Sequence, residues 1–142
     1  MRRDPAVDTR SARAAAGMSL LGAWTIAVPY LGRALGLEVN VASRLEIVDH
    51  VVPGAVVSLA AGCLFALKRR RAIAGGWPAI VGGGVCFLAG FWVLATHVPL
   101  LADAARGRAR WPAALWHSST AVPIVAGSLW YALRPPVARA SG

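Results

Sequence analysis

Hydrophobic residues along this chain gather into four long blocks, and polar residues gather between the blocks. The blocks carry almost no charge and cover residues 17–36, 47–67, 75–101 and 112–133. A helix of about 20 residues, rising 1.5 Å per residue, reaches across a hydrocarbon layer of roughly 30 Å. The pattern therefore predicts an all-α membrane protein with four transmembrane helices.

Prolines inside these blocks modify the predicted helices. A proline removes one backbone N–H, so the carbonyl four residues earlier in a helix loses its partner. Pro123 should therefore kink the fourth helix and free the Ser119 carbonyl. Pro53 lies in the first turns of the second helix, where a missing N–H costs least.

The composition agrees with a lipid environment. Hydrophobic residues make up 57% of the chain, against the roughly 45–50% that is usual in soluble domains, and the mean hydropathy is +0.57. Fifteen basic residues against six acidic ones give a net charge of +9. In a soluble protein this charge would suggest nucleic-acid binding, but here the basic residues flank apolar segments, which is typical of membrane orientation. We expect the lipid bilayer to be the partner, and no nucleic acid.

The distribution of Lys and Arg predicts the topology. Residues 1–16 form a polar, basic tail that we expect to be disordered, and residues 134–142 form a second tail. The two tails and the run Lys68-Arg69-Arg70-Arg71 hold ten basic residues, whereas the other side of the membrane receives five. The positive-inside rule then places both termini in the cytoplasm of a multi-pass protein of the cell membrane.

The second half of the chain repeats features of the first half in the same order. The matches lie 65 to 70 residues apart: Gly22-x-Trp24 and Gly90-x-Trp92, Val28-Pro29 and Val98-Pro99, His50 and His117, Ala61-Gly62-x-Leu64 and Ala126-Gly127-x-Leu129. A two-helix unit returns to its starting side, so both copies insert in the same orientation. We therefore expect two tandem parallel hairpin repeats, residues 17–67 and 75–133, forming a four-helix bundle.

These repeated residues resemble those of the SPW-repeat membrane proteins. The resemblance lies in a Gly-x-Trp helix with a proline at its outer end, followed by a second apolar helix. The Ser-Pro-Trp signature of that family stands here as Val28-Pro29-Tyr30 and Val98-Pro99-Leu100, so only the proline is kept. The resemblance implies a small integral membrane protein without an assigned activity, and it implies no catalytic residues.

Small residues recur four apart on the second and third predicted helices. Such stripes allow helix backbones to approach closely. A short basic turn joins these two helices, so we expect them to be antiparallel neighbours whose stripes pack together. The helix-packing residues predicted in this way are Gly54, Ser58 and Gly62 on one helix, and Gly82, Cys86 and Gly90 on the other.

Three histidines are the main candidates for chemistry. His50, His97 and His117 all fall within a turn or two of the predicted outer surface, near Glu46, Asp49 and Asp103. Histidine at such a position usually hydrogen-bonds to loop carbonyls, and we expect this role first. One alternative is cofactor binding, because neutral imidazoles also bind haem iron and transition-metal ions. Their spacing matches no metal-binding motif. Another alternative is substrate or proton handling, since ionisable groups at membrane depth are functional candidates.

The sequence favours a non-enzymatic membrane component over an enzyme. With little mass outside the bilayer, the protein should self-associate or join a larger membrane complex. The first alternative is a haem- or metal-binding electron-transfer subunit that uses His50, His97 and His117. The second is a small channel or transporter, which the nearly uncharged interiors of the predicted helices disfavour.

Overall fold

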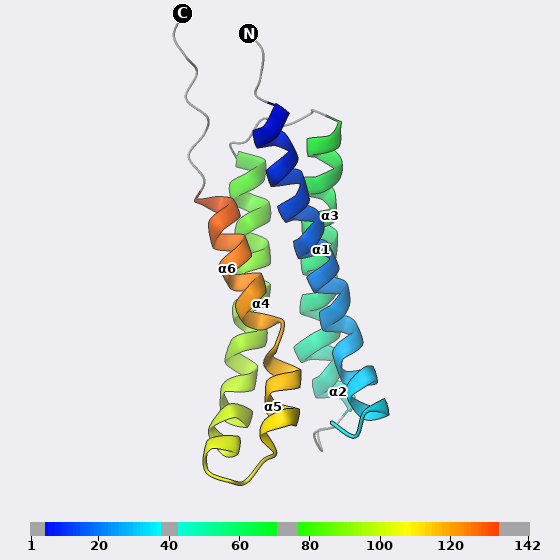
Figure 1. Cartoon of the computed structure of the whole chain (residues 1–142), viewed down its shortest axis with the longest axis vertical. Helices are drawn as coiled ribbons and strands as arrows, with labels where there is room; N and C mark the ends of the chain where they lie inside the picture. Colours follow the sequence, from blue (N-terminus) through cyan, green and yellow to red (C-terminus); the bar gives the residue numbers. More distant parts are fainter. Residues whose placement is uncertain (1–4, 38–42, 71–76, 134–142) are drawn as a thin grey trace, which may run out of the picture.

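The computed structural model describes residues 5–37, 43–70 and 77–133, and every regular element in these ranges is a helix. The elements are α1 (Pro5–Ala34), α2 (Ser43–Glu46), the π-helix η1 (Ile47–Val51), α3 (Val52–Arg69), α4 (Trp77–Ala105), α5 (Trp111–Ser118) and α6 (Ala121–Ala132). They run side by side as one elongated bundle (Figure 1).

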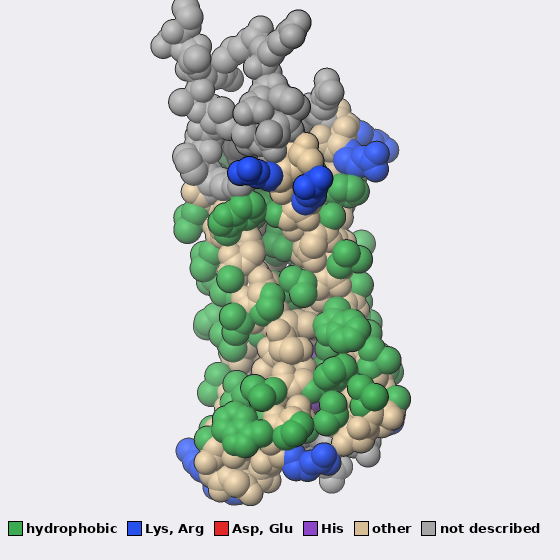
Figure 2. All heavy atoms as spheres, in the orientation of Figure 1, with side chains coloured by type: hydrophobic (Ala, Val, Ile, Leu, Met, Phe, Trp, Pro, Cys, Tyr) green, Lys and Arg blue, Asp and Glu red, His purple; other side chains and the backbone are tan. Residues whose placement is uncertain are grey.

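Three of the rods are long and apolar enough to cross a membrane. They span Thr9–Ala34, Arg44–Arg69 and Trp77–Ala105, the second being α2, η1 and α3 in continuous succession. Large apolar side chains such as Leu20, Leu59 and Leu88 point outward and are 66–72% exposed. Basic side chains gather near the two ends of the bundle, and apolar side chains cover much of the surface between (Figure 2). The prediction of an all-α protein with membrane-length apolar helices is confirmed.

The first helix begins earlier than the sequence pattern predicts. We expected residues 1–16 to be a disordered tail, but α1 starts at Pro5, so that expectation is wrong for the part of the tail that the structure describes. Pro5 suits the first position of a helix, and the alanines that follow it have the highest helix propensity. Ala15 is fully buried, so this extra length also packs against the bundle.

The fourth apolar block forms two helices instead of one kinked helix. The chain turns at Ser119 and Thr120, between α5 and α6. The cause is local, because Pro123 has no N–H for the Ser119 carbonyl. The two helices have 8 and 12 residues, so neither reaches membrane length alone. They follow each other along α4 (Figure 1), and four membrane crossings remain a prediction.

Two helical hairpins make up the bundle. One pairs α1 with the α2–η1–α3 rod, and the other pairs α4 with α5 and α6 (Figure 1). α1 begins and α6 ends at the same end of the bundle. We call the opposite end, where α4 ends and α5 begins, the histidine end. This arrangement is compatible with the predicted tandem repeat, which nothing in the helix packing tests directly.

The small-residue stripe of α3 packs against α1, and not against α4 as we expected. A Cβ placed on Gly54 would lie 2.7 Å from the Gly22 carbonyl oxygen, so the backbones nearly touch there. The Ser19 hydroxyl donates to the Ser58 carbonyl, and the Ser58 hydroxyl donates to the Ser19 carbonyl, each over 3.0 Å. Helix α1 thus presents its own small residues at the matching spacing, which the prediction overlooked.

The remaining stripe residues meet different neighbours. Gly62 lies near the Ser19 hydroxyl, 3.5 Å from where its Cβ would be, and Gly82 packs on the Leu64 side chain of α3. Gly90 packs on Ile124 of α6. The Cys86 thiol lies 4.0 Å from the Val57 carbonyl. The α4 stripe is therefore shared between α3 and α6, and the predicted face-to-face pairing of the two stripes is wrong.

An apolar core fills the bundle away from the histidine end. It joins α1, α3, α4 and α6 and consists of Ala15, Met18, Val57, Ala61, Leu64, Cys86, Ala89, Ile124 and Tyr131, each at most 9% exposed. Between this core and the turn from α4 to α5, the interior holds the three histidines.

Candidate metal centre

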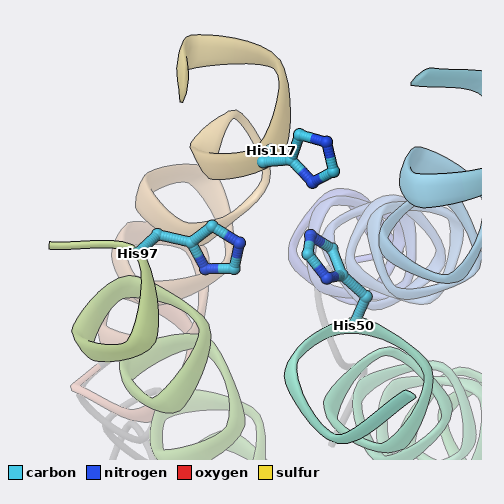
Figure 3. Close-up of side chains that lie close together, drawn as sticks. All are labelled: His50, His97 and His117. Atoms are coloured by element: carbon cyan, nitrogen blue, oxygen red, sulfur yellow. The ribbon is translucent and has the colours of Figure 1, made fainter. Parts of the chain in front are cut away.

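Three buried histidines from three different helices converge near the histidine end. His50 lies in η1, His97 in α4 and His117 in α5, and their exposures are 2%, 5% and 3%. Their rings point toward a common centre between the helices (Figure 3). We call these residues the histidine cluster. All three rings are buried inside the bundle, and the carbonyl that His97 contacts, that of Val93, belongs to helix α4 and not to a loop as we expected.

The nitrogens of the histidine cluster are nearly close enough to share one ion. One ring nitrogen from each residue can be chosen so that all lie within 4.8 Å of one another. The ring of His50 stands edge-on to His97 and His117, with centroids 4.7 and 5.2 Å apart, and the other two rings are 6.2 Å apart. Tetrahedral bonds of about 2.0–2.1 Å place ligand nitrogens roughly 3.4 Å apart. Inward shifts on the order of 1 Å therefore complete a three-nitrogen site.

A π-helical turn aims His50 at the cluster. The N–H of Val52 donates to the Ile47 carbonyl, which is the five-residue spacing of a π-helix. Pro53 follows directly and cannot donate to the Asp49 carbonyl that an α-helix would offer it. The wider turn just before the proline removes this conflict. Such π-helical turns are frequent at functional sites.

The hydrogen bond of His97 determines which of its nitrogens is available. Its Nδ1 lies 2.7 Å from the Val93 carbonyl oxygen. A carbonyl only accepts, so Nδ1 carries the proton and Nε2 keeps its lone pair. Thr96 supports the same carbonyl, because its hydroxyl donates to Val93 over 3.1 Å. Metal-bound histidines typically donate their second N–H to a carbonyl in this way.

His117 is positioned by its neighbour Trp116. The indole N–H of Trp116 donates to the Val28 carbonyl of α1 over 2.9 Å, and the ring meets Trp24 edge-on at 5.8 Å. Gly32 leaves room for this contact, since a Cβ there would lie 3.0 Å from the Trp116 nitrogen and 3.6 Å from the Nε2 of His117. Trp116 and Gly32 therefore hold α5, and His117 with it, against α1.

Several nitrogens of the cluster are buried without a partner. Among the described residues, neither ring nitrogen of His50 has a hydrogen bond, nor does the Nε2 of His117. A buried polar group without a partner costs about 1–3 kcal/mol, and native proteins contain few of them. A metal ion at the centre would bind one nitrogen of each ring and would so give His50 a partner for one of its two nitrogens.

Two of the three nearby carboxylates are paired with arginines. Glu46 pairs with Arg33 at 3.7 Å, and Asp103 accepts from Arg108 with a closest distance of 2.5 Å. Asp49 is half-buried and lies beside His50 in η1. Among the described residues, the group with metal-ligand geometry consists of the three histidines alone. The donor set is therefore three imidazoles, and a four-coordinate ion held by them would have one position left for a further ligand.

Sequence reasoning identified the three histidines but missed the residues that position them. The Trp116–Val28 contact joins residues far apart in the chain, so only the fold brings them together. The π-helical turn left a local signal, namely a proline three residues after His50. No protein-family model, curated protein or solved structure matches this chain, so the resemblance to the SPW-repeat proteins stays a prediction.

Proposed function

We propose that this protein is a non-enzymatic integral membrane protein that binds one divalent transition-metal ion through His50, His97 and His117. The observation that carries the proposal is the convergence of three buried imidazoles, two of which have ring nitrogens without a hydrogen bond among the described residues. Imidazole nitrogen suits zinc, copper and nickel, whereas magnesium and calcium prefer oxygen. Zinc or copper(II) is therefore the ion that the donor set favours.

A bare ion suits the site better than haem. A haem held by two histidines lies flat between them and needs an open slot there. Here the ring of His50 stands edge-on to His97 and His117, at interplanar angles of 86° and 78°, and lies within 5.2 Å of both. The three rings thus form a compact triangle, which accommodates a single ion and leaves no slot for a porphyrin.

The proposed membrane placement uses all four rods of the bundle. Helices α5 and α6 together serve as the fourth crossing, so α1 begins and α6 ends on one side of the membrane. Basic residues such as Lys68 and Arg69 lie at that end. The positive-inside rule assigns it to the cytoplasm, and the histidine cluster then lies toward the outer side.

The ion would cross-link the two hairpins. His50 belongs to the first hairpin, whereas His97 and His117 belong to the second. His50 and His117 occupy equivalent places in the proposed tandem repeat. An ion bound only by the folded chain stabilises it, by about 2.7 kcal/mol at a concentration of 100 times Kd. Such a cross-link would make a small accessory component of the membrane more rigid.

Metal titration of the purified protein tests this function. The protein is purified in mild detergent, stripped with a chelator and titrated with Zn²⁺ and Cu²⁺, and bound metal is measured by mass spectrometry. We expect one ion per chain and a rise in the unfolding temperature on binding. Metal at background level in both titrations would refute the proposal. A Soret band in the purified protein would instead favour the haem alternative.

Trp116→Phe should weaken zinc binding without abolishing it. Phenylalanine keeps most of the ring but loses the N–H that donates to the Val28 carbonyl over 2.9 Å. The lost hydrogen bond is worth about 1 kcal/mol, so zinc affinity should fall roughly fivefold to tenfold as His117 gains freedom. Competition with a fluorescent chelator measures this change.

The matched control for that variant is Trp111→Phe, at the exposed start of the same helix. Trp111 is 49% exposed, and its replacement should leave zinc affinity unchanged. Equal affinities for both variants and the unmodified protein would show that Trp116 does not position His117.

A further inference from the structure

We infer that the histidine cluster exchanges its ion with one side of the membrane only, the side of the histidine end. This inference rests on the proposed function and deepens it, because it states where the ion comes from. It separates a metal-holding protein from one that conducts the ion across the bilayer.

The cluster is close to one end of the bundle and far from the other. At 1.5 Å per residue, His50 lies roughly 9 Å from Arg44 and roughly 28 Å from Arg69, the two ends of its rod. His97 lies roughly 12 Å from Ala105 and roughly 30 Å from Trp77. An ion leaving toward the far end would therefore cross most of the hydrocarbon layer inside the protein.

The part of the bundle between the histidine cluster and the opposite end offers the ion no hydration and few ligands. It is filled by the apolar core that joins α1, α3, α4 and α6, with side chains such as Val57, Ala61 and Ile124 at 0% exposure. Two of the buried hydroxyls bond to backbone carbonyls, since Thr25 donates to Leu21 and Ser128 to Ile124, whereas the buried hydroxyl of Thr120 has no hydrogen bond among the described residues. Burial of an unsolvated charge in such surroundings is strongly unfavourable. The core therefore closes this route.

The part of the bundle between the histidine cluster and the histidine end can open through movement of α5. This short helix follows a turn in which Gly107 adopts a φ of +71°, and it ends at the break before α6. Trp116 of α5 donates to the Val28 carbonyl of α1, and Arg110, just before α5, donates to the Gly36 carbonyl just after α1 over 3.2 Å. Movement of α5 carries one ligand, His117, away from the centre, and so exposes the ion on that side alone.

Chelator access in proteoliposomes tests the inference. Zinc-loaded protein is reconstituted into vesicles of phosphatidylcholine and phosphatidylglycerol, and the fraction of molecules in each orientation is measured by protease cleavage of a tag after Gly142. EDTA, which does not cross the bilayer, is added outside for a time that strips a detergent-solubilised sample completely. Zinc remaining with the vesicles is then measured by mass spectrometry, with His97→Ala vesicles as the background.

The fraction of zinc that EDTA removes should equal the fraction of molecules whose tag is protected from the protease. EDTA should remove zinc only from molecules whose tag is protected inside the vesicle, because the tag and the histidine end lie on opposite sides. Removal of all zinc, of none, or of the fraction with accessible tags would each overturn the inference. Failure of the detergent-solubilised protein to retain zinc at all would instead refute the proposed function, so the two failures are distinguishable.

Discussion

Replacing His97 with alanine is expected to reduce zinc affinity by more than about 100-fold, since loss of a supporting outer residue alone costs about 10–100-fold at metal sites. His97 presents its Nε2 to the centre because the Val93 carbonyl occupies its Nδ1. Removal of this ring leaves two nitrogens, and the ion loses a third of the protein ligands. Alanine at His50 or His117 should have effects of similar size. Competition titration in detergent measures all three.

A matched variant separates loss of the ligand from loss of its surroundings. Thr96→Val removes the hydroxyl that lies 3.2 Å from the Nδ1 of His97 but leaves the ring in place. We expect its zinc affinity to fall by about tenfold, the lower end of the loss for a supporting outer residue. Full zinc affinity in any of the three alanine variants would show that the corresponding histidine is not a ligand.

The metal-free protein offers an independent check on the histidine cluster. Both ring nitrogens of His50 are buried without a hydrogen bond in the described part of the chain. His50→Phe replaces them with apolar atoms of similar shape, so the metal-free form should be as stable as the unmodified protein or more so. The same variant should bind no zinc. A large loss of metal-free stability would instead assign His50 a structural role.

Gly54→Leu is expected to lower the free energy of unfolding by about 3 kcal/mol or more. Even a Cβ at this position would lie 2.7 Å from the Gly22 carbonyl oxygen and 3.1 Å from the Ile26 backbone nitrogen. Backbone atoms cannot turn aside as a side chain can, so α1 must move away from α3. That movement also breaks the two reciprocal hydrogen bonds between Ser19 and Ser58. Unfolding in detergent, followed by circular dichroism, measures the loss.

Gly84→Leu is the control for this substitution. Gly84 lies within α4, where a Cβ would meet nothing within 4 Å, so leucine there points into open space. Its higher helix propensity should leave stability unchanged or raise it by up to about 1 kcal/mol. If Gly54→Leu and Gly84→Leu unfolded alike, close contact between α1 and α3 would not be what holds the first hairpin together.

Much of the helical architecture could be predicted from the sequence, for a reason specific to apolar surroundings. Within a hydrocarbon layer each backbone group must be satisfied internally, so a long apolar block has helix as its simplest solution. The blocks around Thr9–Ala34, Arg44–Arg69 and Trp77–Ala105 followed this rule. Pro123 likewise indicated where the fourth block would be interrupted. The sequence also indicated which three histidines lie at one level of the bundle.

The tertiary structure alone decided which faces meet. A helix that is apolar all round carries no polar stripe to mark its outer face, so its rotation and its neighbour are set by packing. For this reason the Gly54–Ser58 stripe met Ser19 and Gly22 of α1, against expectation. For the same reason the sequence determined the depth of the three histidines but not their convergence. The close α1–α3 contact fixes the rod that carries His50, the Trp116–Val28 bond fixes α5 with His117, and only the packed bundle brings both to His97 of α4.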